Sequence, residues 1–236
     1  MKFAYLNLKN HPRGNVILQN LIANDLLPQL IIEEDSSLAQ KNYNAIASYF
    51  DSTKFPSTQE IVKNHNIPII EVKNHNDFNC EKALKSIDLD LVVLGDTRII
   101  KPNIMSIPKI GIINSHPGYL PEVRGNNPYI WALIYDLPQG CSVHFIDENV
   151  DTGDLILRER IEIQNFKSYP SLLEKINDLC AQMIVEAVKK ISAKNYERIP
   201  QNMIKKAGTQ NKTTEFFAAT AEIKAKAIKK LESGNF

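Results

Sequence analysis

Two stretches of this 236-residue sequence carry side chains suited to acid–base and oxyanion chemistry. Asn114 and His116 follow the apolar run Ile110–Ile113, and Asp151 follows the alternating run Cys141–Ile146. Residues two apart on an extended chain point to the same side, so the carboxamide and the imidazole can face one ligand. The carboxamide can donate to a developing oxyanion, the imidazole can move protons near pH 7, and the carboxylate can hold the imidazole. Alone, an Asn-x-His pair after a strand is usually an ordinary loop.

The elements that must position these side chains alternate along the chain. Short apolar runs are expected to be strands at Phe3–Leu6, Leu30–Ile32, Ile67–Val72, Leu89–Leu94 and Ile110–Ile113. Helical patterns lie between them, at Asn15–Leu27, Ser57–His65 and Asp77–Ile87. This alternation predicts an α/β fold with a Rossmann-like, mostly parallel sheet that has helices on both faces. Ligands of such sheets bind beyond the carboxyl ends of the strands, where Asn114 and His116 are expected.

The second half of the chain is expected to add further elements. They are an aromatic helix at Asn127–Tyr135, strands at Cys141–Ile146 and Leu155–Ile163, a long helix at Ser168–Ile191, and an Ala/Lys-rich helix at Ala218–Leu231. We expect Trp131 and Tyr135 to pack on the sheet, and His144 to be a packed strand residue. Residues 1–195 are predicted to form the core, and residues 196–236 a short C-terminal helical extension with a polar loop at Lys205–Thr214. The extension is expected to pack on its own core or on a second subunit, because a short isolated helix is marginal in water.

Composition excludes several classes of function. Lys plus Arg number 28 and Asp plus Glu number 27, so the net charge of +1 provides no field for a nucleic-acid partner. Three cysteines with no C-x-x-C pair predict neither a disulfide framework nor structural zinc, and they fit a reduced, cytoplasmic protein. No apolar stretch is long enough for a membrane span, so no membrane partner is expected. The repeated Lys-Asn-His-Asn segments, with His65 and His75, are expected to be polar strand ends rather than metal ligands.

Three motifs in register resemble one family. They are Asn-x-His-Pro at 114–117, Leu-Pro-x-x-Arg-Gly at 120–125 and Asp-Thr-Gly-Asp at 151–154. Together they resemble the signature of the folate-dependent formyltransferases, from about Leu91 to Ile163. The resemblance implies an enzyme that moves a formyl group from N10-formyltetrahydrofolate to a primary amine without a metal. It implies that Asn114, His116 and Asp151 are catalytic, with the roles given above.

The resemblance also implies where the folate binds. In this family, main-chain groups of two loops hold the pterin. The corresponding residues are Gly95, Asp96, Thr97, Arg98, Ile99 and Ile100, and then Asp147, Glu148, Asn149 and Val150.

The amine acceptor is predicted to be a nucleotide-linked sugar. The short tail and neutral charge weigh against tRNA, and the loop Asn10–Asn15 lacks the Gly-rich phosphate loop of glycinamide ribonucleotide formyltransferases. His116–Pro121 with Asn127-Pro-x-x-Trp131 is similar to the nucleotide-sugar N-formyltransferases. This implies a substrate such as a dTDP-4-amino-4,6-dideoxyhexose for surface polysaccharide or O-antigen synthesis, and a homodimer. The alternatives are the glycinamide ribonucleotide enzyme and a non-catalytic folate-binding module.

Five side chains are expected to bind the acceptor. Cationic residues near the carboxyl ends of the strands would hold its diphosphate, and aromatic rings would cover its base or sugar. These residues are Arg13, Arg98, Arg124, Tyr119 and Tyr129.

Overall fold

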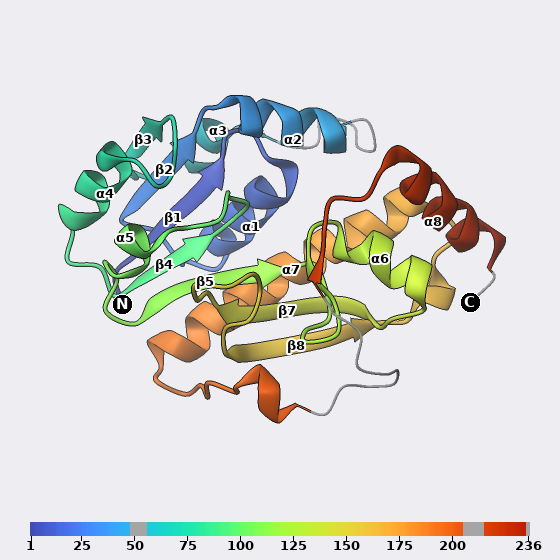
Figure 1. The fold of residues 1–236 in the computed structure, drawn as a ribbon. Coiled ribbons are helices and arrows are strands. Elements are labelled where there is room, and N and C mark those ends of the chain that lie inside the picture. The colour runs from blue at the N-terminus through green and yellow to red at the C-terminus, as the bar shows by residue number, and fades with distance from the viewer. Residues whose placement is uncertain (48–55, 205–214, 235–236) are drawn as a thin grey trace. The chain divides into compact units, whose positions relative to one another are not determined.

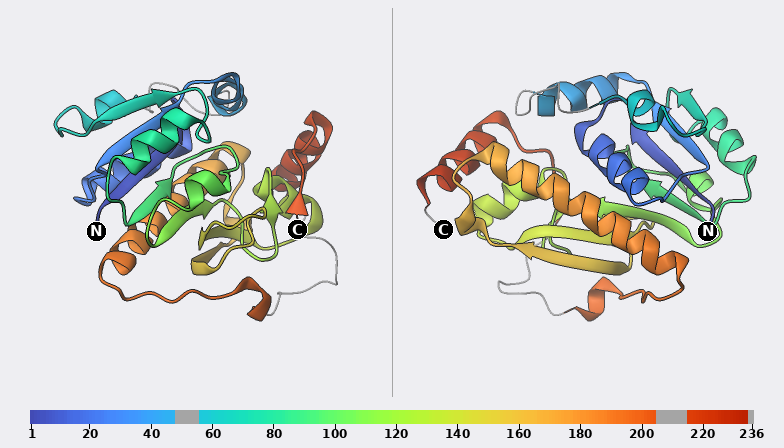
Figure 2. Two further views of the ribbon diagram at one scale, coloured as in Figure 1. Left: turned by 60° about the vertical axis from the view of Figure 1, so that its left-hand side comes forward. Right: turned by 180° about the vertical axis from the view of Figure 1, so that it is seen from behind.

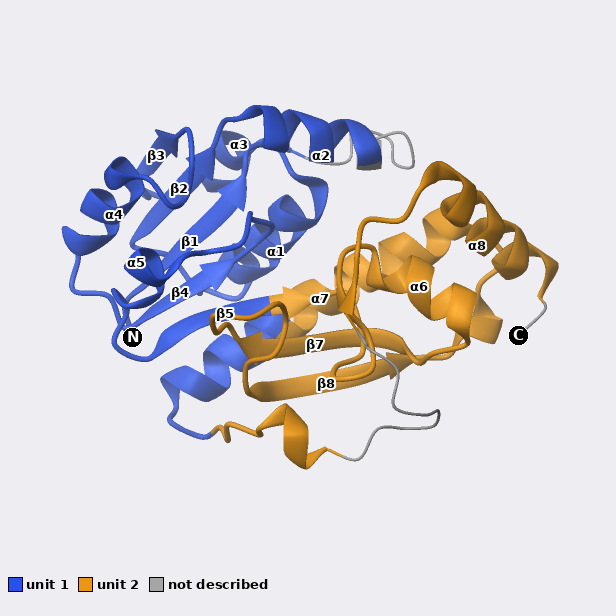
Figure 3. Ribbon diagram, in the orientation of Figure 1, with its two compact units in different colours: residues 1–114, 184–195 blue, residues 115–183, 196–236 orange. Residues whose placement is uncertain are grey.

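The computed structural model describes residues 1–47, 56–204 and 215–234 (Figure 1). The chain divides into two compact units (Figure 3). Unit 1 comprises Met1–Asn114 and Ile184–Asn195, and unit 2 comprises Ser115–Met183 and Tyr196–Phe236. Each unit has its own buried residues and is described separately. No helix among the described residues is long and apolar enough to cross a membrane.

Unit 1 is built on parallel strands in the order β3-β2-β1-β4-β5. Their bounds are β1 (Phe3–Leu8), β2 (Leu30–Glu34), β3 (Ile69–Val72), β4 (Leu91–Leu94) and β5 (Gly111–His116). In the central register, Tyr5 of β1 pairs with Ile31 of β2 on one side and Val93 of β4 on the other. Every residue of β1, β2 and β4 is buried. Burial on both faces explains why these strands are apolar runs instead of alternating patterns.

Two helices of unit 1 begin at residues whose side chains cap them. The described helices of unit 1 are α1 (Pro12–Ala23), α2 (Ser37–Ala47), α3 (Thr58–Val62), α4 (Phe78–Lys85), α5 (Pro102–Met105) and the end of α7 (Tyr169–Ser192). Ser57 and Glu60 form a capping box at the start of α3, and the Asp77 side chain caps α4 by accepting from the main-chain N–H of Cys80. In the rear view of Figure 2, α1 lies against the strands of unit 1.

Unit 2 contains an antiparallel pair, β7 (Gln139–Phe145) and β8 (Leu155–Ile161). The strand order continues as β5-β7-β8, and β5 belongs to unit 1 through Asn114 and to unit 2 from Ser115 onwards. The seven strands confirm the predicted mostly parallel, Rossmann-like α/β fold. Unit 2 also holds α6 (Pro128–Tyr135), the short parallel pair β6 (Arg124–Gly125) and β9 (Glu215–Phe216), the 3-10 turns Ile163–Asn165 and Gln201–Met203, and α8 (Ala221–Ser233).

The C-terminal extension packs on the other part of unit 2, residues 115–183. Ile199 exchanges two main-chain hydrogen bonds of 2.9 Å with Leu155 at the start of β8. Helix α8 packs on α6, where Lys230 Nζ donates to the carbonyl of Leu133 at 2.8 Å and to Asp136 at 2.6 Å. The division into compact units places the extension together with residues 115–183. The sequence instead predicted a boundary near residue 195 between a core and the extension, and that boundary stays a prediction. The polar loop predicted at Lys205–Thr214 lies outside the described residues.

The aromatic side chains of α6 differ from the expectation that they pack on the sheet. The rings of Trp131, Tyr135 and Phe216 are stacked in all three pairings, with centroids 5.2–5.8 Å apart and planes within 10–19°. The indole N–H of Trp131 donates to the carbonyl of Phe217 at 2.8 Å. This side of α6 therefore covers β9 of the extension, a partner that helical periodicity alone does not identify.

Two cysteines that are distant in sequence meet inside unit 2. Cys141 on β7 and Cys180 on α7 are fully buried thiols that form no disulfide, and their sulfur atoms lie 3.2 Å apart. Their separation of 39 residues gave no indication of this contact.

Candidate active site

The imidazole of His116 and the carboxylate of Asp151 meet in unit 2. His116 ends β5 and is 3% exposed, and its Nδ1 lies 3.4 Å from Asp151 Oδ2. Asn114 is half-buried and lies two residues earlier on β5, so alternation along the strand gives both side chains the same face. The structure thus brings together the predicted His–Asp pair and carries the predicted Asn on the same strand.

The turn that carries Asp151 is tied down from several sides. Asp151 has a left-handed backbone (φ 52°), which Asp tolerates better than most residues, and its Oδ2 accepts from the main-chain N–H of Gly125 at 2.8 Å. Gln201 Nε2 donates to the carbonyls of Asp151 (2.9 Å) and Gly153 (2.8 Å). A Cβ at Gly153 would lie 1.9 Å from the carbonyl oxygen of Phe145. Gly153 therefore allows the close approach of these two backbone segments.

The Asp151 carboxyl stays ionised at neutral pH. Burial alone would raise its pKa, but the charges of His116 and His144 and the Gly125 N–H outweigh burial and hold the pKa well below its usual range. A largely buried negative charge is therefore fixed beside two imidazoles.

The two ring nitrogens of His116 both face oxygen atoms. Nε2 lies 2.9 Å from the carbonyl oxygen of Val123, and Nδ1 faces Asp151. Each ring nitrogen is therefore placed to donate to an oxygen atom when it carries a proton. Gly118 makes room for this ring, since a Cβ there would lie 2.6 Å from His116 Nε2 and 2.8 Å from Pro128 Cβ.

His144 and Gln201 are site residues that sequence reasoning missed. His144 is packed on β7 as expected, but its Nε2 also lies 3.5 Å from Asp151 Oδ1, and its ring is 6.3 Å from that of His116 in an edge-to-face arrangement. The sequence did contain one indication of a site role for His144, because this residue lies near the carboxyl end of β7, just before the turn that carries Asp151. Gln201 lies in the extension, outside every recognised motif.

The predicted cationic residues already have partners within their own units. In unit 1, Arg13 pairs with Asp96, and Arg98 Nε donates to Glu34 at 2.6 Å. In unit 2, Arg124 Nη2 donates to Gln201 Oε1 at 2.9 Å. The Nε atom of Arg124 is buried and has no hydrogen-bond partner among the described residues. Diphosphate binding by these three arginines stays a prediction.

The two predicted tyrosines lie in different surroundings of unit 2. The ring of Tyr119 lies beneath two guanidinium groups of β8, those of Arg158 at 4.7 Å and Arg160 at 4.9 Å. Neither arginine was identified from the sequence. The ring of Tyr129 is 6.1 Å from that of Tyr169. Tyr119 thus lies between Arg158, which is 3.7 Å from Glu122, and the exposed Arg160, whereas Tyr129 packs on α7.

The two predicted folate loops follow strands, as expected. In unit 1, residues 95–100 follow β4, with Ile100 buried and Ile99 74% exposed. In unit 2, residues 147–150 follow β7, and Asp147 Oδ1 accepts from Thr152 Oγ1 at 2.6 Å and from the main chain of Asn149 at 3.1 Å. Their role in folate binding stays a prediction. Among the described residues, no group of three or more His, Cys, Asp or Glu side chains is placed to hold a metal ion.

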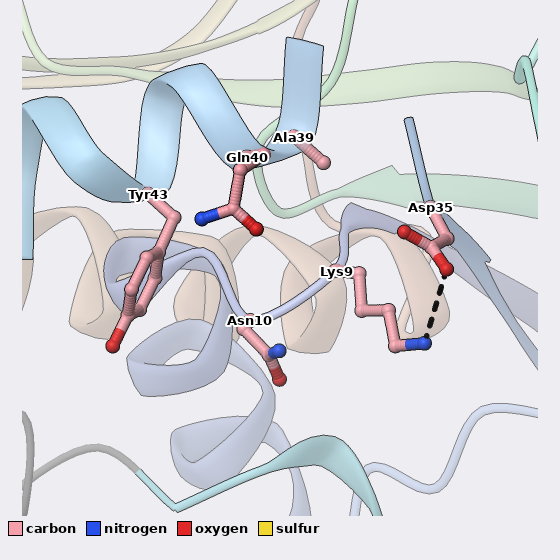
Figure 4. Close-up of a pocket in the computed structure, with 6 residues that line it drawn as sticks. All are labelled: Lys9, Asn10, Asp35, Ala39, Gln40 and Tyr43. Atoms are coloured by element: carbon pink, nitrogen blue, oxygen red, sulfur yellow. Dashed lines mark hydrogen bonds and ion pairs between the residues drawn. The ribbon is translucent and has the colours of Figure 1, made fainter. Parts of the chain in front are cut away.

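Unit 1 also contains a polar cavity of about 200 Å³ beyond β1 and β2 (Figure 4). Its lining residues are Lys9, Asn10, Asp35, Ala39, Gln40 and Tyr43. Lys9 Nζ lies 3.3 Å from Asp35 and also contacts Glu71, so its charge is already balanced. The cavity is better suited to hydroxyl or amide groups than to a free anion.

The sequence profile of one protein family, described as formyl transferase, matches residues 38–188. The chain belongs to this family. A methionyl-tRNA formyltransferase from Kosmotoga olearia is 27% identical over 186 residues, which cover 74% of this chain and 60% of that protein. The chain spans between 47% and 60% of the length of the first such relatives.

Solved structures show the same fold at low identity. Glycinamide ribonucleotide transformylase 1 from Symbiobacterium toebii has a TM-score of 0.65 at 16% identity, covering 84% of this chain and 94% of that one. A sugar N-formyltransferase from a Shewanella species has a TM-score of 0.63 at 14% identity, covering 98% of this chain and 88% of that one. These likenesses concern the fold alone.

Proposed function

We propose that this formyl transferase family member uses N10-formyltetrahydrofolate to formylate the amine of a nucleotide-linked amino sugar. The observation that carries the proposal is the largely buried, ionised Asp151 beside His116 at the end of β5, with Asn114 on the same strand. This set supplies an amide donor, an imidazolium and a fixed counter-charge, the groups that acyl transfer to an amine requires.

Two features fit the formyl donor. The main-chain N–H groups of residues 97–100 have no hydrogen-bond partner in the part of the chain that the structure describes, and an extended backbone can match the alternating donors and acceptors of a pterin edge. The exposed Ile99 offers an apolar surface in the same loop. The bound donor supplies the formyl carbon that the amine attacks.

The chain's own residues would stabilise charge and move one proton. The Asn114 carboxamide would donate to the developing oxyanion, an interaction worth about 3 kcal/mol. The Nε2–H of His116, which now donates to the Val123 carbonyl, would exchange that acceptor for the oxyanion. Asp151 would keep the ring protonated while one proton passes from the amine to the departing folate nitrogen.

The choice of acceptor rests on the distribution of charged residues and on how much of this chain matches the fold of a sugar N-formyltransferase. The fold of the Shewanella sugar N-formyltransferase extends over 98% of this chain. Arg124 keeps one buried donor without a partner among the described residues, and Arg160 adds an exposed positive charge near Tyr119, which suits a small anionic handle such as a diphosphate. Methionyl-tRNA is the second candidate, because the curated sequence relatives carry that name. The balanced net charge of +1 disfavours a polyanion of that size.

A panel of amines tests the proposal. The chain is incubated with N10-formyltetrahydrofolate and dTDP-4-amino sugar, UDP-4-amino sugar, glycinamide ribonucleotide or methionyl-tRNA, and products are detected by mass spectrometry. We expect formylation of a nucleotide sugar, and none by His116→Ala. Preferred formylation of methionyl-tRNA or glycinamide ribonucleotide would overturn the acceptor, and no formylation of any amine would overturn the activity.

A further inference from the structure

One carboxamide in unit 1 bridges the loop that follows β4. Asn76 Nδ2 donates to the carbonyl of Ile99 at 2.9 Å, and Asn76 Oδ1 accepts from the main-chain N–H of Lys101 at 2.7 Å. Asn76 is itself held by Asn103, whose side chain donates to its carbonyl at 3.3 Å. A side chain far from this loop in sequence thus fixes main-chain groups two residues apart.

A buried ion pair holds the same loop from a second side. Glu34 ends β2 and is fully buried, and its carboxylate accepts from both Nε and Nη2 of Arg98. Ser36 Oγ donates to it at 2.6 Å, and the main-chain N–H of His75 donates at 2.9 Å. Burial would raise the pKa of Glu34, but these donors outweigh burial and lower it, so the pair is charged.

These contacts leave a defined set of donors unused. Asn76 takes the carbonyl of Ile99 and the N–H of Lys101, while the N–H groups of residues 97–100 have no partner among the described residues. The loop therefore has a fixed backbone with open donors. A ligand that binds through the main chain gains affinity when the backbone is already held in its bound conformation.

We propose that Asn76 and the Glu34–Arg98 ion pair are positioning residues that preorganise this loop for the pterin of the folate donor, an inference that rests on the proposed function. Arg98 acts through Glu34 on the loop backbone and does not bind the diphosphate of the acceptor. The second Lys-Asn-His-Asn segment, 73–76, connects β2 to the proposed folate loop: the main-chain N–H of His75 donates to Glu34 at the end of β2, and the Asn76 side chain donates to Ile99.

The two roles of Arg98 predict opposite kinetic signatures. As a positioning residue, Arg98→Lys should raise KM for the folate donor and leave KM for the acceptor within about twofold of the unaltered value. As a ligand of the diphosphate, it would raise KM for the acceptor instead. The lysine retains a charge beside the buried Glu34, so the variant is expected to fold where Arg98→Ala would leave that carboxylate unpaired.

Binding of tetrahydrofolate to the full chain tests the inference directly. Asn76→Ala should weaken binding about tenfold or more, with kcat at saturating donor changed less than about threefold. The matched control is Asn66→Ala, the equivalent and exposed position of the first Lys-Asn-His-Asn segment, which should bind as the unaltered chain does. Asn76→Asp keeps the acceptor but loses the donor to Ile99, and should show an intermediate loss.

The outcomes separate this inference from the proposed function. If the unaltered chain binds tetrahydrofolate and folded Asn76→Ala, checked by its melting temperature, binds equally tightly, the positioning role is overturned. A rise in acceptor KM alone for Arg98→Lys would return Arg98 to the acceptor site. Failure of the unaltered chain to bind tetrahydrofolate would overturn the donor, and this inference with it.

Discussion

Replacing Asp151 with Asn removes one charge from a site where its carboxylate is held by three contacts. The carboxylate lies 3.4 Å from His116 Nδ1 and 3.5 Å from His144 Nε2, and accepts from Gly125 at 2.8 Å. At an effective dielectric constant near 20, a full charge pair at 3.4 Å is worth roughly 5 kcal/mol, which is an upper bound for the lost stabilisation of imidazolium. Since about 1.4 kcal/mol is tenfold in rate, we expect turnover to fall by about 10³-fold.

The assay is formation of formylated amine at saturating donor and acceptor, with Asp154→Asn as the control. Asp154 lies three residues along the same turn and loses the same charge, but it takes part in the turn through its main-chain carbonyl, which accepts from the N–H of Phe145. The control should keep near-normal turnover. An Asp151→Asn variant that folds and keeps more than about a tenth of normal turnover would refute the argument that this carboxylate sustains the imidazolium.

Three further outcomes follow from the contacts. Gly118→Ala should lower turnover at least ~100-fold, because the new methyl group displaces the His116 ring; normal turnover would show that the ring can yield. Burial lowers the pKa of His11 to about 4. His11 is therefore neutral when folded and protonates on unfolding below its usual value of about 6.5, so stability is full above that pH and is lost as pH falls toward 4. Urea titrations should show roughly 2 kcal/mol less contribution from His11 at pH 5 than at pH 7, and a His11→Asn variant should show a flatter profile. Phe216→Ser should shift the emission of Trp131, the one tryptophan of the sequence, to longer wavelength by exposing its stacked face; an unchanged spectrum would contradict the stacking.

The fold was predictable because its strands are buried on both faces. The apolar runs of β1, β2 and β4 stand out from the helical segments between them, and parallel strands bring their carboxyl ends to one edge. The proximity of His116 and Asp151 could be predicted for the same reason, since His116 ends one strand and Asp151 follows another. Their catalytic roles remain predictions that the variants above test.

Contacts between distant polar residues were not predictable from the sequence. Glu34 and Arg98 are 64 residues apart, and Gln201 lies 50 residues from Asp151. Such pairs depend on strand register and on the path of the extension, which local patterns do not encode. His144 was interpreted as packing alone, because a buried strand position gives no sign of what its ring faces.

The hydrogen bonds of Gln201 have a consequence for chimeric enzymes. Its amide donates to the carbonyls of Asp151 and Gly153, and its oxygen accepts from Arg124. A graft that exchanges residues after 195 for those of a relative must supply a side chain of this length with both a donor and an acceptor. Glutamate lacks the donor, and asparagine is one methylene shorter. An exchange intended to alter only assembly or specificity would therefore also loosen the turn that carries Asp151.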